Sequence, residues 1–237
     1  MPYLADSFVE ALKRVVGLDP YVLDAVRISL TCAVTATIFG TFIGVPIGAA
    51  LGLKRFRGRS AAVIGVNALM ATPTVVVGLL VYSFICRRGP LGPLGLLFTP
   101  SAIIIGQSLL VTPIVASLTI SALQQLSPSA VKTVATLGIT GVRSALILLR
   151  EARAGVGAAV VTGFARAVGE VGVAMMLGGN ILYSTRTITT AIALETSKGA
   201  FEVAIALGLI LLFIAYVANL TFQVLQSGTL VRDGRTI

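Results

Sequence analysis

Residues 101–126 read SAIIIGQSLLVTPIVASLTISALQQL and contain no charged residue. A helix needs about 20 such residues to cross the roughly 30 Å hydrocarbon core of a bilayer. Three further charge-free runs of comparable length occupy residues 28–53, 60–86 and 203–225. A fifth run, at 155–183, is as long but contains two charged residues. The sequence therefore predicts an all-α, polytopic membrane protein with about five transmembrane helices.

The overall composition supports a membrane protein, because the 237 residues are 56% hydrophobic and only 11% charged. That leaves too little charge to cover a soluble domain. Residues 1–25 contain four acidic residues, which argues against a cleavable signal peptide, and we expect an N-terminal interfacial segment there. Residues 26–226 form the predicted transmembrane domain and residues 227–237 a cytoplasmic tail. With no histidine, and both cysteines inside predicted spans, the sequence predicts no metal site.

The basic residues predict the orientation of the chain in the membrane. With five spans, the first loop, the segment 127–154 and the tail share one side and carry ten Lys and Arg residues, against seven on the other. The positive-inside rule then places the N-terminus outside and the C-terminus in the cytoplasm. The net charge of +9 therefore indicates contact with the lipid bilayer and no nucleic-acid partner.

Arg166 and Glu170 are the only charged residues within a predicted span. Each charge at bilayer depth costs at least about 2.5–3.5 kcal/mol on insertion scales, so such residues normally pair or face a polar cavity. Their spacing of four residues places them on one helix face, where they can neutralise each other. Two interpretations stay open at this point: a self-sufficient ion pair, or a pair beside the transport pathway or at a subunit seam.

The stretch after the fourth span is rich in polar side chains that could bind an oxyanion at an outer mouth. A capped loop at the membrane surface is the alternative interpretation. The candidate residues of this outer mouth are Asn180, Thr185, Arg186 and Thr187.

The segment 127–154 is the longest part of the chain between predicted spans, and it lies on the positive side. It begins with Ser127 and Pro128, which suit a helix start, and we expect helix around Gly138 and Gly141. A chain with such short loops elsewhere is expected to use this segment to contact a cytoplasmic partner. The chain has no phosphate-binding loop of the GxxxxGK[ST] type and no motif of a hydrolase, so we expect a subunit that is not an enzyme.

Five short motifs, in order, resemble those of one transporter family. The sequence ATLG at 135–138 resembles the cytoplasmic "EAA" loop of bacterial ATP-binding-cassette import permeases, although KTV stands at 132–134 in place of Glu-Ala-Ala. GFARAVGEVG at 163–172 resembles the signature of molybdate, tungstate and sulfate permeases. MMLGGNI at 175–181, TRTI at 185–188 and PTVVVGL at 73–79 agree with the same family, and the double glycine before Asn180 is most similar to its tungstate branch.

This resemblance implies a homodimeric permease of the type I importer fold, with a cytoplasmic ATPase dimer and an extracytoplasmic substrate-binding protein as partners. ATP and Mg would bind to the ATPase, and this chain would bind no cofactor. The resemblance implies import of a tetrahedral oxyanion, tungstate first, with molybdate or sulfate as alternatives and an autonomous secondary transporter as a more distant one. The implied ATPase-coupling residues are Ala135, Thr136, Leu137, Gly138 and Gly141.

Overall fold

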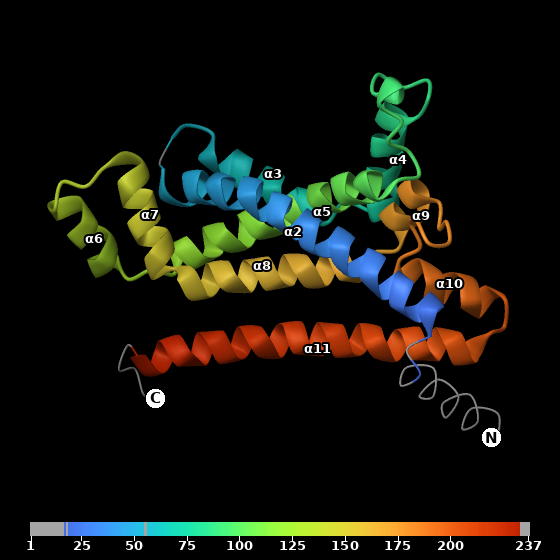
Figure 1. The fold of residues 1–237 in the computed structure, drawn as a ribbon. Coiled ribbons are helices and arrows are strands. Elements are labelled where there is room, and N and C mark those ends of the chain that lie inside the picture. The colour runs from blue at the N-terminus through green and yellow to red at the C-terminus, as the bar shows by residue number, and fades with distance from the viewer. Residues whose placement is uncertain (1–16, 18, 55, 233–237) are drawn as a thin grey trace.

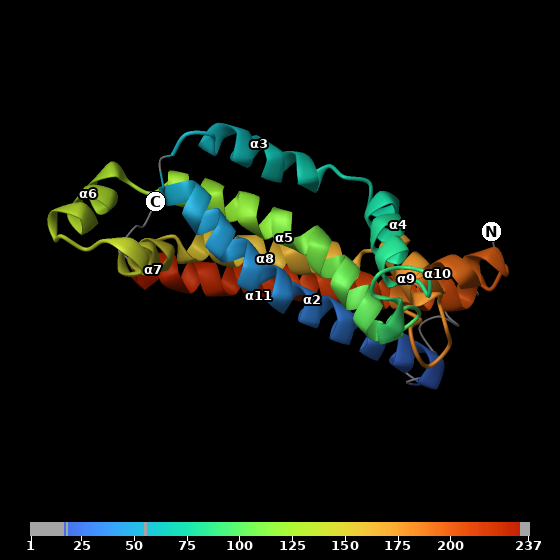
Figure 2. The ribbon, with the colours of Figure 1, turned by 90° about the horizontal axis from the view of Figure 1, so that it is seen from above.

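The computed structural model describes residues 17, 19–54 and 56–232, and every regular element in this part of the chain is a helix. Figures 1 and 2 show the longer helices running lengthwise between the two ends of the molecule: α2 (Pro20–Leu53), α5 (Pro100–Gln124), α8 (Arg153–Val168) and α11 (Phe201–Arg232). The shorter α3 (Arg59–Met70) runs beside part of α5. Helices α6 (Pro128–Thr136) and α7 (Gly141–Glu151) lie at one end, and α9 (Gly172–Gly178) and α10 (Ile188–Ser197) lie at the other. Long helices that alternate in direction between two ends are the arrangement expected of a polytopic bundle.

Helix α2 (Pro20–Leu53) begins earlier than the sequence predicted. The Asp19 side chain accepts a hydrogen bond from the N–H of Tyr21 at 2.9 Å, and Pro20 occupies the first helical position, where its missing N–H costs nothing. Residues 20–25, predicted to belong to an interfacial segment, therefore start the first span. The remainder of that prediction, residues 1–16 and 18, lies outside the described residues.

Helix α5 (Pro100–Gln124) forms the centre of the bundle because glycines let α2 approach it closely. A Cβ atom at Gly48 would lie 2.7 Å from the carbonyl oxygen of Ala116, and one at Gly40 would lie 2.6 Å from Val111. Helix α8 (Arg153–Val168) approaches the same helix through Gly163. The small residues, spaced four apart, therefore serve helix packing within one chain.

The predicted spans 60–86 and 155–183 are not continuous helices. The first consists of α3 (Arg59–Met70) and α4 (Thr74–Ile85), bent by 96°. The bend lies at Pro73, which has no N–H and disfavours helical backbone at the residue before it. The second consists of α8 and α9 (Gly172–Gly178), bent by 57°, and it ends at Gly179, whose φ of +69° stops the helix.

The described residues therefore contain α2, α5 and α11 (Phe201–Arg232) as unbroken helices long and apolar enough to span a membrane, with the two bent pairs as further candidates. Helix α11 includes the predicted span 203–225 and continues into residues 227–232, which were predicted as tail. The short helix η1 (Gly92–Leu94) follows α4, and α10 (Ile188–Ser197) precedes α11.

The predicted coupling segment 127–154 folds into α6 (Pro128–Thr136) and α7 (Gly141–Glu151). The Ser127 hydroxyl caps α6 by accepting a hydrogen bond from the N–H of Ala130. The expected helix around Gly138 is wrong, because Gly138 has a φ of +68° and lies in the turn between the two helices. This left-handed conformation favours glycine over any residue with a side chain.

Candidate functional site

Glu170 occupies the break between α8 and α9 and holds both helices. Its Oε2 lies 2.9 Å from Nη1 of Arg166, and its Oε1 accepts a hydrogen bond from the N–H of Val173 at 3.1 Å. Its backbone carbonyl accepts a hydrogen bond from the hydroxyl of Thr189 in α10 at 2.7 Å. The Glu170 side chain is only 2% exposed, so a buried carboxylate joins α8 to α9, while the backbone carbonyl of the same residue contacts α10.

The breaks of the two bent pairs lie side by side. A Cβ atom at Gly172, the first residue of α9, would lie 2.9 Å from Oγ1 of Thr74, the first residue of α4. One turn further along α4, a Cβ atom at Gly78 would lie 3.0 Å from the sulfur of Met176 in α9. Discontinuous helices form the substrate sites of secondary transporters, and the two adjacent breaks are a comparable irregularity inside this bundle.

Arg166 differs from Glu170 because its side chain is 39% exposed. The adjacent carboxylate of Glu170 offsets its positive charge, so Arg166 attracts an anion only weakly. The ion pair instead stabilises the backbone at the break between α8 and α9. In the described part of the chain, no group of three His, Cys, Asp or Glu side chains could hold a metal ion.

Two of the predicted outer-mouth hydroxyls are buried and used within the loop that follows α9. The Thr185 hydroxyl donates to the carbonyl of Gly178 and accepts from the N–H of Ile181. The Thr187 hydroxyl caps α10 by accepting from the N–H of Thr190, whose own hydroxyl accepts from the N–H of Thr187. These contacts stabilise the loop and leave neither hydroxyl facing solvent.

The other two predicted residues, Asn180 and Arg186, contact each other. Arg186 Nε donates to Oδ1 of Asn180 at 3.1 Å, and Arg186 Nη2 donates to the carbonyl oxygen of Asn180 at 3.1 Å. Asn180 has a φ of +52°, a conformation that asparagine tolerates better than most residues. The Arg186 guanidinium group therefore stabilises the loop after α9 by binding the side chain and the backbone of Asn180.

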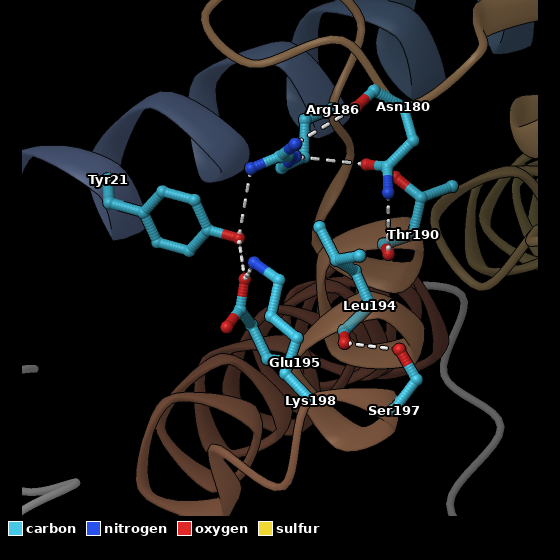
Figure 3. A network of polar contacts seen from close by, with 8 residues as sticks. All are labelled: Tyr21, Asn180, Arg186, Thr190, Leu194, Glu195, Ser197 and Lys198. Atoms are coloured by element: carbon cyan, nitrogen blue, oxygen red, sulfur yellow. Dashed lines mark hydrogen bonds and ion pairs between the residues drawn. The ribbon is translucent and has the colours of Figure 1, made fainter.

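Figure 3 shows that Arg186 belongs to a larger network, which the sequence did not reveal. Arg186 Nη1 donates to the Tyr21 hydroxyl at 3.4 Å, and that hydroxyl donates to Oε1 of Glu195 at 2.8 Å. Lys198 Nζ lies 3.0 Å from the same carboxylate oxygen. The network joins the start of α2 to the loop after α9 and to α10. The spacing of Glu195 and Lys198 was the only signal of it in the sequence.

Glu195 lies in α10, outside the membrane-spanning helices. The charged residues of this network determine the pKa of its carboxyl group. Burial by itself raises the pKa of the carboxyl group. The hydrogen bonds from Lys198 and Tyr21, with the positive charges of Lys198 and Arg186, outweigh burial, so the net pKa lies below its ordinary value.

Glu195→Gln is expected to destabilise the protein at neutral pH by about 1 kcal/mol, because a neutral amide can accept the hydrogen bond from Tyr21 but cannot strengthen it with a charge or pair with Lys198. Since the folded-state pKa of Glu195 is lowered, its stabilising effect is present above the ordinary pKa and is lost as the pH falls through the folded-state pKa. Thermal unfolding in detergent over a pH series should show the two curves converging in acid. Glu151→Gln, at an exposed carboxylate of α7, is the matched control, and an equal pH response in both variants would contradict the prediction.

The five predicted coupling residues are all exposed at the α6–α7 end of the bundle. Val134 of α6 and Leu148 of α7 are buried in one hydrophobic cluster that also contains Leu123 of α5. The turn presents Leu137, which is 67% exposed, and α7 presents Val142, which is 76% exposed. A pair of short helices that share a buried cluster with the bundle and have an apolar exposed edge is suited to contact another protein.

The model of the family described as "binding-protein-dependent transport system inner membrane component" matches residues 44–230. The chain belongs to this family. The permease is 39% identical over 226 residues to the tungstate uptake system permease protein TupB of Peptoclostridium acidaminophilum, with 95% of the permease and 99% of that relative covered. It is 37% identical over 220 residues to a probable anion ABC transporter permease protein of Haloferax volcanii, with 91% and 95% covered.

Solved structures share the fold of the permease. A chain from inward-facing conformations of the MetNI methionine ABC transporter matches with a TM-score of 0.71 and 17% identity, over 90% of the permease and 97% of that chain. An amino acid ABC transporter matches with a TM-score of 0.65 and 15% identity, over 90% and 95%. The predicted type I importer fold is confirmed. As a multi-pass inner-membrane component of a binding-protein-dependent system, the permease works with ATPase and substrate-binding subunits.

Proposed function

We propose that this permease moves tungstate into the cytoplasm, driven by ATP hydrolysis on a separate ATPase dimer. The observation that carries the proposal is the match to tungstate uptake permeases over almost their whole length. The relative from Peptoclostridium acidaminophilum is 39% identical, and the one from Campylobacter jejuni is 38% identical over 219 residues, with 92% of both chains covered. Sulfate and molybdenum permeases match at 26% and 30% identity.

In the proposed complex, two copies of the permease form the pathway, and ATP with Mg binds only to the ATPase. The α6–α7 end, with Ala135, Thr136, Leu137, Gly138 and Gly141, contacts the ATPase in the cytoplasm. This orientation places the N-terminus outside and the C-terminus inside, as the distribution of Lys and Arg favours. The extracytoplasmic binding protein then docks at the end that contains α9 and α10.

The described residues support a pathway without a tight substrate site. Arg166 is neutralised by Glu170, and Arg186 is held by Asn180 and Tyr21. An importer that selects its substrate in a separate binding protein needs only weak, transient contacts in the membrane, because strong binding would slow release. The adjacent helix breaks at Thr74 and Gly172 supply a place where such a pathway can open and close.

Uptake competition tests the proposed substrate. Proteoliposomes that contain the permease, its ATPase and its cognate binding protein should accumulate labelled tungstate only with ATP. Excess unlabelled tungstate should suppress uptake most strongly, molybdate less and sulfate least. Stronger suppression by sulfate or molybdate than by tungstate would reassign the substrate, and uptake without the ATPase would overturn the proposed mechanism.

A further inference from the structure

One exposed stripe of α2 changes from charged to apolar along its length. Helical spacing places Asp24, Arg27, Thr31, Val34 and Ile38 on one face. Arg27 is the last charged residue before the charge-free run 28–53, so it lies where the hydrocarbon core begins. Val34 is 45% exposed and Ile38 is 61% exposed, so the part of the stripe at the depth of the bilayer core consists of exposed apolar side chains.

The charged end of this stripe borders a cavity of about 230 Å³. Asp24, Arg27 and Thr31 of α2 line it, with Tyr183 and Ser184 of the loop after α9. Among the residues that the structure describes, neither Asp24 nor Arg27 forms an ion pair, and the three hydroxyls donate no hydrogen bond. The cavity therefore offers a cation, an anion and hydroxyl groups to a ligand, and Tyr183, which is 64% exposed, suits the membrane interface.

The apolar end of the stripe borders an open groove of about 560 Å³ between α2, α8 and α11. Val34 and Ile38 line it together with Phe164 of α8 and Ala218 of α11. The two threonines that border the groove, Thr37 and Thr221, both donate their hydroxyls to their own helices, so only hydrocarbon faces a ligand. At 1.5 Å per residue, Val34 and Ile38 lie roughly 10 and 17 Å along α2 from Arg27, which is within reach of one acyl chain.

We propose that this stripe binds one zwitterionic phospholipid. Its phosphate lies at Arg27 and the neighbouring hydroxyls, its ammonium group lies at Asp24, and an acyl chain lies over Val34 and Ile38 in the groove. Charge complementarity decides between this ligand and a free oxyanion, because Asp24 attracts an ammonium group but repels an anion. The same continuous stripe also matches both parts of a lipid, whereas a free oxyanion would use only the cavity. The inference is independent of the transported substrate.

Native mass spectrometry of the full-length chain, released from mild detergent, tests the proposal. Titration with phosphatidylethanolamine should give one retained lipid per chain, in preference to phosphatidylglycerol. Arg27→Gln should lower retention about fivefold, as expected for a lost charge-assisted contact, while Arg27→Lys should keep most of it. Ala218→Phe, which fills the groove, should also lower retention. Arg88→Gln, at an exposed arginine of the loop after α4, should leave retention unchanged.

Asp24→Asn provides the most specific test, because it removes only the partner of the ammonium group. This variant should bind phosphatidylglycerol as well as it binds phosphatidylethanolamine. Two results would overturn the proposal. One is equal lipid retention by Arg27→Gln and the unchanged protein. The other is lipid retention that is unchanged in Ala218→Phe but is lost from the unchanged protein on addition of millimolar tungstate or inorganic phosphate, which would assign the cavity to a free oxyanion.

Discussion

Replacing Leu137 with Asp is expected to lower ATP-driven uptake at least about tenfold while leaving the membrane bundle intact. Leu137 is 67% exposed in the turn between α6 and α7, so its side chain contributes little to the folding of this chain. A partner that covers Leu137 in the unchanged protein would instead have to bury a carboxylate without a counter-charge. That penalty amounts to several kcal/mol, and a tenfold loss needs only about 1.4 kcal/mol.

Two measurements separate lost coupling from lost folding. Membrane yield and the elution profile of the purified chain should be unchanged for Leu137→Asp, whereas uptake into proteoliposomes and substrate-stimulated ATP hydrolysis should fall together. Leu137→Met is the matched control, because it keeps an apolar side chain of similar volume and should retain uptake. If Leu137→Asp supported full uptake, the α6–α7 turn would not be the contact with the ATPase.

The helices of the bundle could be predicted because they depend on local composition, but their bends could not. Charge-free runs located α2, α5 and α11 to within several residues of most of their ends. Proline alone did not mark the bends, since Pro46 and Pro113 lie inside unbroken helices whereas Pro73 lies at the 96° bend. The difference depends on tertiary packing, because α4 leaves the direction of α3 to pack against α9.

For the candidate sites too, the sequence predicted residue types but not the contacts that the fold creates. Residue type was enough to single out Asn180 and Arg186, but Tyr21, which contacts Arg186, is 165 positions away in the chain. Only the fold brings such a partner close. The hydroxyls of Thr185 and Thr187 look available in the sequence, yet loop and helix-cap hydrogen bonds use both. A sequence gives the chemical groups of a site, and the backbone around them decides which groups stay free to bind a ligand.

Glu170→Gln is expected to lower both the membrane yield of the permease and its uptake activity. Glutamine has the shape of glutamate and can still accept the hydrogen bond from the N–H of Val173. It cannot balance the charge of Arg166, whose Nη1 lies 2.9 Å from the carboxylate in the unchanged protein. An unpaired arginine at bilayer depth costs at least about 2.5–3.5 kcal/mol on insertion scales.

The double variant Arg166→Gln, Glu170→Gln distinguishes the two interpretations of the pair. It removes both charges together, so a pair that only neutralises itself should recover its yield and its uptake. A pair that borders the pathway should recover its yield but keep low uptake, because the charges would then act on the passing anion or on the movement of the α8–α9 break. Unchanged yield and unchanged uptake in Glu170→Gln alone would show that the ion pair contributes to neither.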